Sequence, residues 1–338
     1  MERVLHVPLM LTLFDTQTTL LNTTGNDLSP EMKTYYQDRL IDNAEPALVH
    51  DRFGTKYPIP KGKGKTTEFR KYSPLPKALT PLTEGVTPAG NKLNVTTVEA
   101  TVAQYGDFIE ISDVLDLTAI DRNLEESTKL LGGQAGRTCD TVTREVITAG
   151  TNVWYAPKDD GTEITSRAAI DRTCLLTPKV VRHAVAALKR MNTQPLEDGH
   201  YIAIIHTDTA TDIMDNEEWA EMQKYVNPEK MYDGEVGRIG GVVFVESTEA
   251  KIWGGAGAGG DSVYGTLIIG ANAYGVTDVE GGGLQHIVKQ LGSSGTADPL
   301  NQRATSGWKA MKTAERLVEE YMIRVEHGSG TNPQAESN

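Results

Sequence analysis

Apolar and polar residues alternate strictly from Val98 to Val102, in the order Val-Glu-Ala-Thr-Val. A period of two is typical of a strand that is buried on one face only. The earlier segment 66–72 is also rich in residues that favour strands, and four prolines between positions 74 and 88 exclude a regular ladder at the tip. The pattern therefore predicts a long β-ribbon with two arms and an irregular end, spanning about residues 66–112.

The length of this ribbon favours contact with another subunit. Two arms of about 20 residues each, at about 3.3 Å per residue, would reach about 60 Å, whereas a compact chain of this length has a radius of gyration of about 20 Å. Such an arm is too long to fold back only on its own body. We therefore expect it to lie on a second subunit, and the candidate interface residues are Phe69, Arg70, Tyr72, Leu82, Glu84 and Val86.

A second strong pattern predicts a long helix between about Asp113 and Gly150. Apolar residues recur at steps of three, four or seven from Ile120 to Val146, which gives one continuous apolar stripe. A helix of about 28 residues would be about 42 Å long, which is the length of a spine rather than of a surface helix. Glycines inside such a helix each cost about 1 kcal/mol relative to alanine. We expect a bend or close backbone packing there, and the hinge candidates are Gly132, Gly133 and Gly136.

Helical and strand patterns alternate over residues 175–290, which indicates a mixed α/β domain. One helix is expected after the cap Thr177-Pro178 and another over 208–225. Short apolar runs predict strands at 201–206, 242–245 and 265–269.

The two ends of the chain carry weaker signals. Ser29-Pro30 predicts the start of an N-terminal helix. A last strand is expected at 322–326, and the Gly/Ser/Asn-rich tail after it is expected to be disordered.

Composition and charge narrow the functional classes. The chain has 338 residues, which leaves room for two domains or for one domain with large extensions. Its formal net charge of −13 argues against a protein that tracks phosphates, although an acidic shell can still enclose DNA because weak repulsion keeps a genome from adhering to its wall. Cys139 and Cys174 are too few for a disulfide framework, and no apolar run approaches the 18 residues of a membrane span.

Two glycine-rich segments imitate nucleotide-binding motifs without the necessary context. Gly62–Thr66 ends like a phosphate-binding P-loop, but Ile59 stands where the first glycine belongs and a strand pattern follows. Gly255–Gly260 has the letters of a dinucleotide fingerprint, but again a strand pattern follows instead of a helix. We interpret the two segments as a basic linker and a surface loop, and we expect no cofactor.

Other reactive side chains have structural interpretations as well. His200 and His206 could share one face of a strand, but the sequence nominates no third metal ligand. Cys139 lies on the apolar stripe of the long helix, and no Gly-x-Ser-x-Gly elbow occurs. We therefore expect no catalytic residue and no metal site, so that the protein is not an enzyme.

Six separated segments carry a family resemblance: Glu68–Pro76, Pro81–Pro88, Tyr105–Asp113, Gln134–Thr138, Thr143–Glu145 and Glu235–Val242. In this order they resemble the major capsid proteins of tailed bacteriophages in the coliphage N-four type family. The likeness runs from about Leu28 to Glu326, which is nearly the whole chain.

The resemblance implies an α+β chain with the Hong Kong 97-like phage capsid fold. In that fold a final strand returns to the peripheral domain, and the axial domain lies at the capsomer centre. The parts expected on this basis are an N-terminal arm and helix (1–60), an extended β-hairpin loop (61–112), a peripheral domain with the spine helix (113–174), an α/β axial domain (175–299), the return to the peripheral domain (300–327) and a flexible tail (328–338).

The implied function is a major capsid protein that self-assembles as pentamers and hexamers into an icosahedral shell around double-stranded DNA. The expected DNA contact is not sequence-specific, no membrane is involved, and further expected partners are a portal and scaffold or decoration proteins. The expected location is the virion capsid, assembled in the host cytoplasm. Two alternatives remain open: an encapsulin-like compartment shell with a protein cargo, and a cytosolic α/β enzyme with a ligand in the glycine-rich loop.

Overall fold

The computed structural model describes residues 40, 48–59, 65–72, 75–82, 84–85, 87, 90–114, 123–196, 199–223, 235–279, 282–293 and 298–338. The chain divides into two compact units. The first comprises residues 1–42, 106–132 and 285–309, and the second comprises residues 43–105, 133–284 and 310–338. Each unit therefore gathers segments that are far apart in the sequence.

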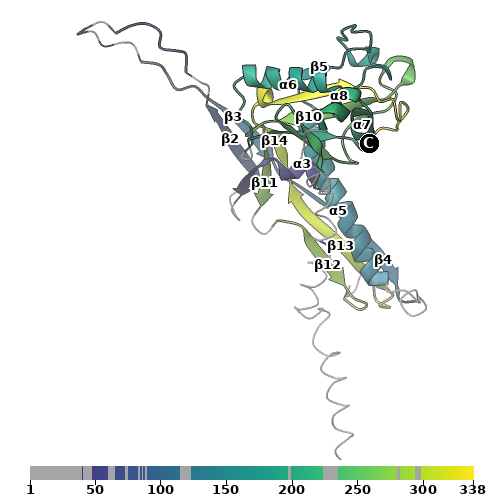
Figure 1. Cartoon of the computed structure of the whole chain (residues 1–338). Helices are drawn as coiled ribbons and strands as arrows, with labels where there is room; N and C mark the ends of the chain where they lie inside the picture. Colours follow the sequence, from purple (N-terminus) through teal and green to yellow (C-terminus); the bar gives the residue numbers. More distant parts are fainter. Residues whose placement is uncertain are drawn as a thin grey trace, which may run out of the picture. The chain divides into compact units, whose positions relative to one another are not determined.

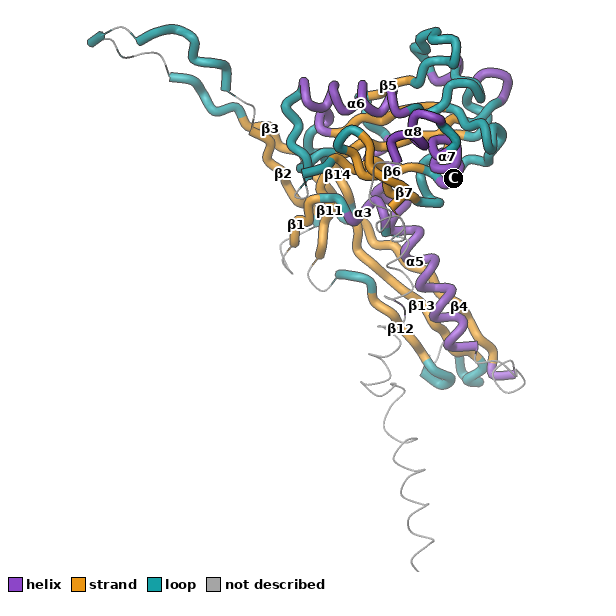
Figure 2. The backbone as a smooth tube through the Cα atoms, viewed as in Figure 1, coloured by secondary structure: helices purple, strands orange, loops and turns teal. Residues whose placement is uncertain are grey.

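A mixed sheet of seven strands, counted over the described residues, forms the core of the second unit (Figures 1 and 2). The pairs β6–β8 and β5–β15 are parallel, and the other pairs are antiparallel. In spatial order the strands are β5 Val153–Tyr155, β15 Met322–His327, β10 Val263–Ile269, β6 Tyr201–Ile205, β8 Val242–Glu246 and β7 Glu235–Ile239, with β9 Ile252–Trp253 also paired to β10. The strands expected at 201–206, 242–245, 265–269 and 322–326 are confirmed as β6, β8, β10 and β15.

Helices cover one face of this sheet. In α6 (Pro178–Arg190), Val181 and Leu188 are fully buried against the strands, and Thr177 caps the helix by accepting a hydrogen bond from the backbone N–H of Val180. The helical structure expected over 208–225 is confirmed for most of its described residues. It is divided into α7 (Thr207–Met214) and α8 (Glu217–Gln223), because the side chain of Asn216 accepts a hydrogen bond from the N–H of Glu218 at 3.0 Å and starts a new helix.

The opposite face of the sheet packs on the end of the long helix and on a smaller sheet. Ile147 of the helix lies in the same apolar cluster as Ile204 and Leu267 of the large sheet. The smaller sheet consists of β1 Thr55–Ile59, β11 Tyr274–Val279 and β14 Ala314–Arg316, and the one-turn helix α3 Val49–Arg52 precedes β1.

The ribbon expected from the sequence is a hairpin of β2 (Thr66–Tyr72) and β3 (Val95–Thr101). Its register places Phe69 opposite Val98, and the ring of Phe69 meets the ring of Tyr57 edge to face at 4.7 Å between centroids. The expected continuation of the returning arm to Ser112 is wrong. β4 (Ala103–Ser112) leaves the hairpin and pairs with β13, so the ladder is seven residues long on each side.

The described part of the first unit contains a three-stranded sheet in the order β12, β13, β4. β12 spans Gln285–Lys289 and β13 spans Arg303–Lys312, and the two are antiparallel. The backbone N–H of Asp113 donates to the carbonyl oxygen of Gln302 at 3.0 Å and extends the pairing beyond β4.

The expected spine helix is α5, which spans Asn123–Thr148, 26 residues. Residues 115–122 of the expected span lie outside the described residues, and α5 is one continuous helix through Gly132, Gly133 and Gly136. The boundary between the two compact units crosses α5 between Gly132 and Gly133. Of the expected N-terminal helix after Ser29-Pro30, the structure describes Leu40 alone, as a buried helical residue.

Two further expectations concern the C-terminal part of the chain. The final strand β15 pairs with β5 of the expected peripheral part and with β10 of the expected axial part, so one sheet spans the two expected parts. The tail 328–338 was expected to be flexible, but polar contacts fix it to the second unit. Ser329 is fully buried, and Asn338 bonds through both side-chain atoms to the backbone of Ala250 and Ile252.

Candidate functional site

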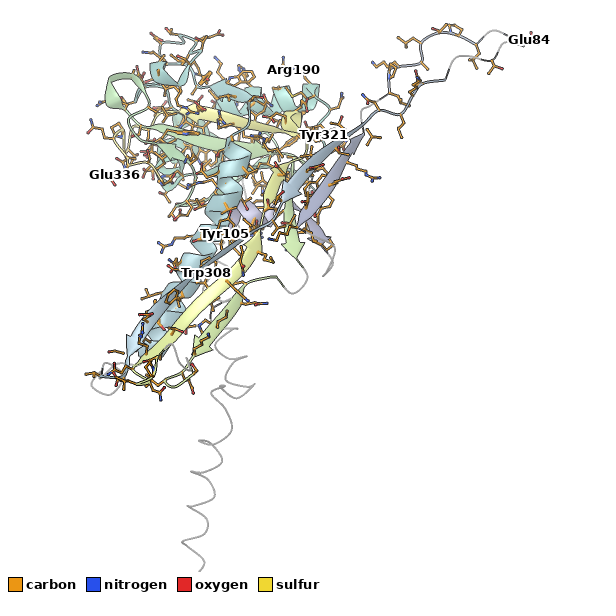
Figure 3. The ribbon with its side chains drawn as sticks, turned by 180° about the vertical axis from the view of Figure 1, so that it is seen from behind. Glu84, Tyr105, Arg190, Trp308, Tyr321 and Glu336 are labelled. Carbon is orange, nitrogen blue, oxygen red and sulfur yellow. The ribbon has the colours of Figure 1, made fainter. Side chains whose placement is uncertain are left out.

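The tip of the β2–β3 hairpin exposes large apolar side chains. Leu79 is 82% exposed and Leu82 is 78% exposed, and Figure 3 shows Glu84 at the far end of the hairpin, beyond the paired strands. Isolated exposed leucines are ordinary on protein surfaces, but four exposed leucines in one loop favour an interaction. The exposed leucines of the loop are Leu75, Leu79, Leu82 and Leu93.

The amino-acid sequence explains why these leucines do not lie in regular strands. The prolines of the loop remove backbone donors and fix φ, so that the strands cannot continue to the tip. Within the described residues 75–94, the one backbone hydrogen bond outside regular elements joins the N–H of Leu79 to the carbonyl oxygen of Lys77. The described leucines of the tip therefore remain exposed to solvent.

A second apolar surface lies on the sheet of the first unit. Phe108 is 60% exposed on β4, and beside it Ile287 of β12 and Trp308 of β13 line a groove of about 440 Å³. Two glycines allow β4 and β13 to approach closely. A Cβ on Gly106 would lie 2.6 Å from the carbonyl oxygen of Trp308, and a Cβ on Gly307 would lie 2.7 Å from Cβ of Phe108. We call this surface, lined by Gly106–Phe108, Ile287, Lys289, Thr305, Gly307 and Trp308, the sheet groove.

The C-terminal end of α5 is anchored by a buried charge network. Arg324 donates to the carbonyl oxygens of Thr148 and Gly150, which satisfies carbonyl groups that a helix end leaves unpaired. Glu326 is fully buried and accepts hydrogen bonds from Arg324 at 2.8 Å and from Arg167 at 2.6 and 2.8 Å. The guanidinium of Arg167 also stacks on Trp253, at 3.8 Å from the ring centroid.

The middle of α5 is joined to α3 by a second polar network. Asp140 is fully buried and binds His50 of α3. Asp51 accepts hydrogen bonds from Lys312 and from Thr143, the latter at 3.0 Å. These contacts fix α3, and with it the start of β1, against the spine helix.

A cavity of about 220 Å³ lies next to this network, in the second unit. Gly136 and Cys139 of α5 line it, together with Asp51 and Lys312. Burial raises the pKa of the Cys139 thiol, so the side chain remains a neutral thiol and packs as a small apolar group. The missing side chain at Gly136 leaves part of this space unfilled.

The residues considered for enzymatic chemistry do not converge. Among the described residues, no group of three or more His, Cys, Asp or Glu is placed to hold a metal ion. The described part of the loop Gly255–Gly260 leads into β10 rather than into a long helix, and most of Gly62–Thr66 lies outside the described residues. Of the described helices, none is both long and apolar enough to cross a lipid bilayer.

The candidate interface residues differ in how exposed they are. Phe69 is 4% exposed and packs in its own chain, so we omit it from the proposed contact surface. Arg70, Leu82 and Glu84 are exposed, whereas the side chain of Tyr72 and the whole of Val86 lie outside the described parts. The sequence interpretation missed Leu75, Leu79, Leu93 and Phe108. For the leucines a signal was available, because they lie in a proline-rich segment that has no helical or strand period.

Comparison with known proteins gives the fold. No protein-family model matches the chain, and no curated protein matches it. Several solved structures, in contrast, match the chain. The capsid of cyanophage P-SCSP1u aligns with a TM-score of 0.62 at 13% identity, over 83% of this chain and 88% of that one. The capsid of Ralstonia phage GP4 aligns at 0.64 and 11% identity, over 85% and 90%. The capsid of Helicobacter pylori bacteriophage KHP30 aligns at 0.58 and 11%, over 81% and 87%.

The chain has the Hong Kong 97-type capsid fold. The expected fold class, an α+β chain with a spine helix, an extended hairpin and an α/β sheet domain, is therefore confirmed. The similarity covers four-fifths or more of each partner, so both compact units contribute to it.

Proposed function

We propose that this chain is the major capsid protein of a tailed bacteriophage, and that it self-assembles as pentamers and hexamers into an icosahedral shell around double-stranded DNA. One observation carries the proposal: among the described residues, the leucines of the hairpin tip are exposed, although the tip belongs to a fold that solved phage capsids share. A monomer gains nothing from such a tip, but a shell of many copies covers it.

The sheet groove of a neighbouring copy is the surface that fits the tip best. Burying a leucine side chain contributes about 1.5–3 kcal/mol, so four leucines contribute about 6–12 kcal/mol per copy before the cost of ordering the loop. Phe108 and Ile287 supply apolar area of the same kind on the receiving side. Because each copy gives one tip and receives another, the contact is heterologous and closes into rings, and many such contacts together hold a shell.

The remaining parts have corresponding roles in this proposal. The spine helix α5 connects the two compact units, and Gly132, Gly133 and Gly136 are its hinge during shell maturation. The acidic chain encloses DNA without sequence-specific contact, since its net charge is −13. Membership in the coliphage N-four type family, a portal, scaffold or decoration proteins, and assembly in the host cytoplasm complete the proposal.

Negative-stain electron microscopy of the purified protein tests this function. We expect closed shells or capsomer rings. A uniform population of small discrete particles at high protein concentration would contradict the proposal and favour an enzyme. Nuclease-protected nucleic acid in particles from a native source supports the phage shell, whereas a co-purifying enzyme inside them would favour a cargo compartment.

A further inference from the structure

The tail 328–338 is bound to its unit almost entirely by hydrogen bonds. After Ser329 no tail residue is buried, so the tail gains little from apolar burial. Its far end is held through Ser337 and Asn338, which bond to the backbone of Gly254 and Ile252. Single hydrogen bonds contribute about 0.5–1.5 kcal/mol each, and segments held in this way open locally before the core does.

One carboxylate holds the near end of the tail. Asp212 of α7 accepts hydrogen bonds from the hydroxyl of Ser329 at 2.6 Å and the N–H of Gly330 at 3.1 Å. It also accepts from Thr331, from the N–H at 3.0 Å and from the hydroxyl at 2.7 Å. These four donors together use the acceptor capacity of both carboxylate oxygens.

His327 lies directly before the tail and is fully buried. Its Nδ1 is 2.8 Å from the carbonyl oxygen of Gly328 and its Nε2 is 2.9 Å from the hydroxyl of Thr266. Because a carbonyl only accepts, Nδ1 carries the proton and Nε2 accepts from Thr266. The neutral imidazole is thus satisfied at both nitrogens. A second proton on Nε2 would place a charge in a fully buried site and would require the Thr266 hydroxyl to turn and accept.

We propose that residues 328–338 form an acid-released strap, closed at neutral pH, and that His327 and the Asp212 carboxylate are its latch. The ionisable groups that face the latch are His206 and Asp208 from the start of α7, Tyr264 from β10 and Glu326 from β15. Tyr264 joins the two sides, since its hydroxyl lies 2.7 Å from Asp208 and 2.8 Å from the carbonyl oxygen of Asn332 in the tail.

The direction of the pH effect follows from burial. Complete burial lowers the pKa of His327 to about 4, from an ordinary value of 6.5, and burial also lowers the pKa of His206, which caps α7. In this proposal the open strap returns His327 to solvent. The open strap then binds more protons than the closed strap below pH 6.5, and the opening equilibrium rises as pH falls towards 4. For His327 alone the equilibrium rises about 30-fold between pH 7.5 and pH 5.

Hydrogen exchange of the purified full chain, followed by mass spectrometry and corrected for intrinsic rates, tests the strap. We expect protection of residues 328–338 to fall at least about 10-fold from pH 7.5 to pH 5, while the amides of α6 keep theirs. Asp212→Asn should open the strap already at pH 7.5. The matched control Asp215→Asn, one turn further along and exposed, should leave it closed.

A variant with a steric clash opens the end of the strap without a change of pH. A Cβ on Gly254 would lie 2.8 Å from the backbone nitrogen of Ser337, so Gly254→Ala should expose the end of the strap at every pH. Equal tail protection at pH 7.5 and pH 5 in the unmodified chain overturns the proposal, whatever the variants do. Equal protection in Asp212→Asn and Asp215→Asn at pH 7.5 removes Asp212 from the latch.

Discussion

His50 binds both oxygens of the Asp140 carboxylate, although the two residues are 90 positions apart in the sequence. The backbone N–H of His50 donates to Oδ1 at 2.7 Å, and its Nδ1 lies 2.6 Å from Oδ2. Both side chains are almost completely buried, at 1% and 0% exposed. This pair joins α3, the element before β1, to the spine helix. The position of α3 therefore depends on the helix.

Asp140→Asn should weaken this joint. An amide can accept at one atom only, so one of the two His50 donors would face an N–H₂ group and lose its acceptor. A buried unsatisfied donor costs about 1–3 kcal/mol, and we expect the free energy of unfolding to fall by that amount in urea titrations. Glu217→Gln, on the exposed surface of α8, is the matched control. An unchanged midpoint in Asp140→Asn would show that the pair does not stabilise the joint.

Cysteines placed on the tip and in the groove should report the proposed contact between copies. The native Cys139 and Cys174 are free and buried, so Leu82→Cys and Ile287→Cys add accessible thiols. With a short bismaleimide, assembled protein carrying both changes should give a ladder of covalent multimers on a denaturing gel. Protein with Leu82→Cys alone should give far less. Monomer bands in both samples would show that the tip lies elsewhere.

Alanine at the helix glycines should stiffen α5. An added Cβ at Gly133 meets nothing within 4 Å, so Gly133→Ala should stabilise the helix by about 1 kcal/mol without new contacts. Replacing Gly132, Gly133 and Gly136 together should trap immature shells, which electron microscopy would record as a smaller, uniform diameter. Normal expansion of the triple variant would exclude a hinge at these positions, and Gly133→Ala alone is the control for helix stability.

Glu326→Gln should destabilise the contacts at the C-terminal end of the spine helix. The fully buried carboxylate neutralises Arg167 and Arg324, and the loss of its charge leaves two guanidinium groups with one neutral acceptor. Breaking a buried pair costs about 3–5 kcal/mol, so the thermal unfolding midpoint should fall by several degrees. Arg303→Gln, which removes a weakly paired and half-exposed cation, should leave it unchanged.

The sequence predicted the elements that local pattern determines. The alternation from Val98 to Val102 gave β3, and the apolar stripe of the long helix gave α5. Pattern could not show that β4 leaves the hairpin, because an alternating strand fits any sheet with a free edge. It also could not show the tail as ordered, since Asp212 and Ser329 meet only after the chain has folded.

The interface candidates also show that local pattern does not predict which residues meet after folding. The position of Phe69 on the ribbon predicts an interface residue, but a close contact with Tyr57 buries it. The exposed leucines lie where proline interrupts the pattern, and a missing period carries no information about what a side chain touches. Phe108 became a candidate only when β12, β13 and β4 were seen to form one sheet.

The central claim is that the apolar hairpin tip of each chain must be covered by another copy, and sedimentation velocity tests it most directly. The unmodified chain and Leu79→Ser/Leu82→Ser should be run side by side, after circular dichroism has shown that both are folded. We expect the unmodified chain to sediment as large closed assemblies and the double variant to remain a 36.8 kDa monomer or a small capsomer. A compact monomer of the unmodified chain at high concentration, or equal assembly of both proteins, would contradict the account.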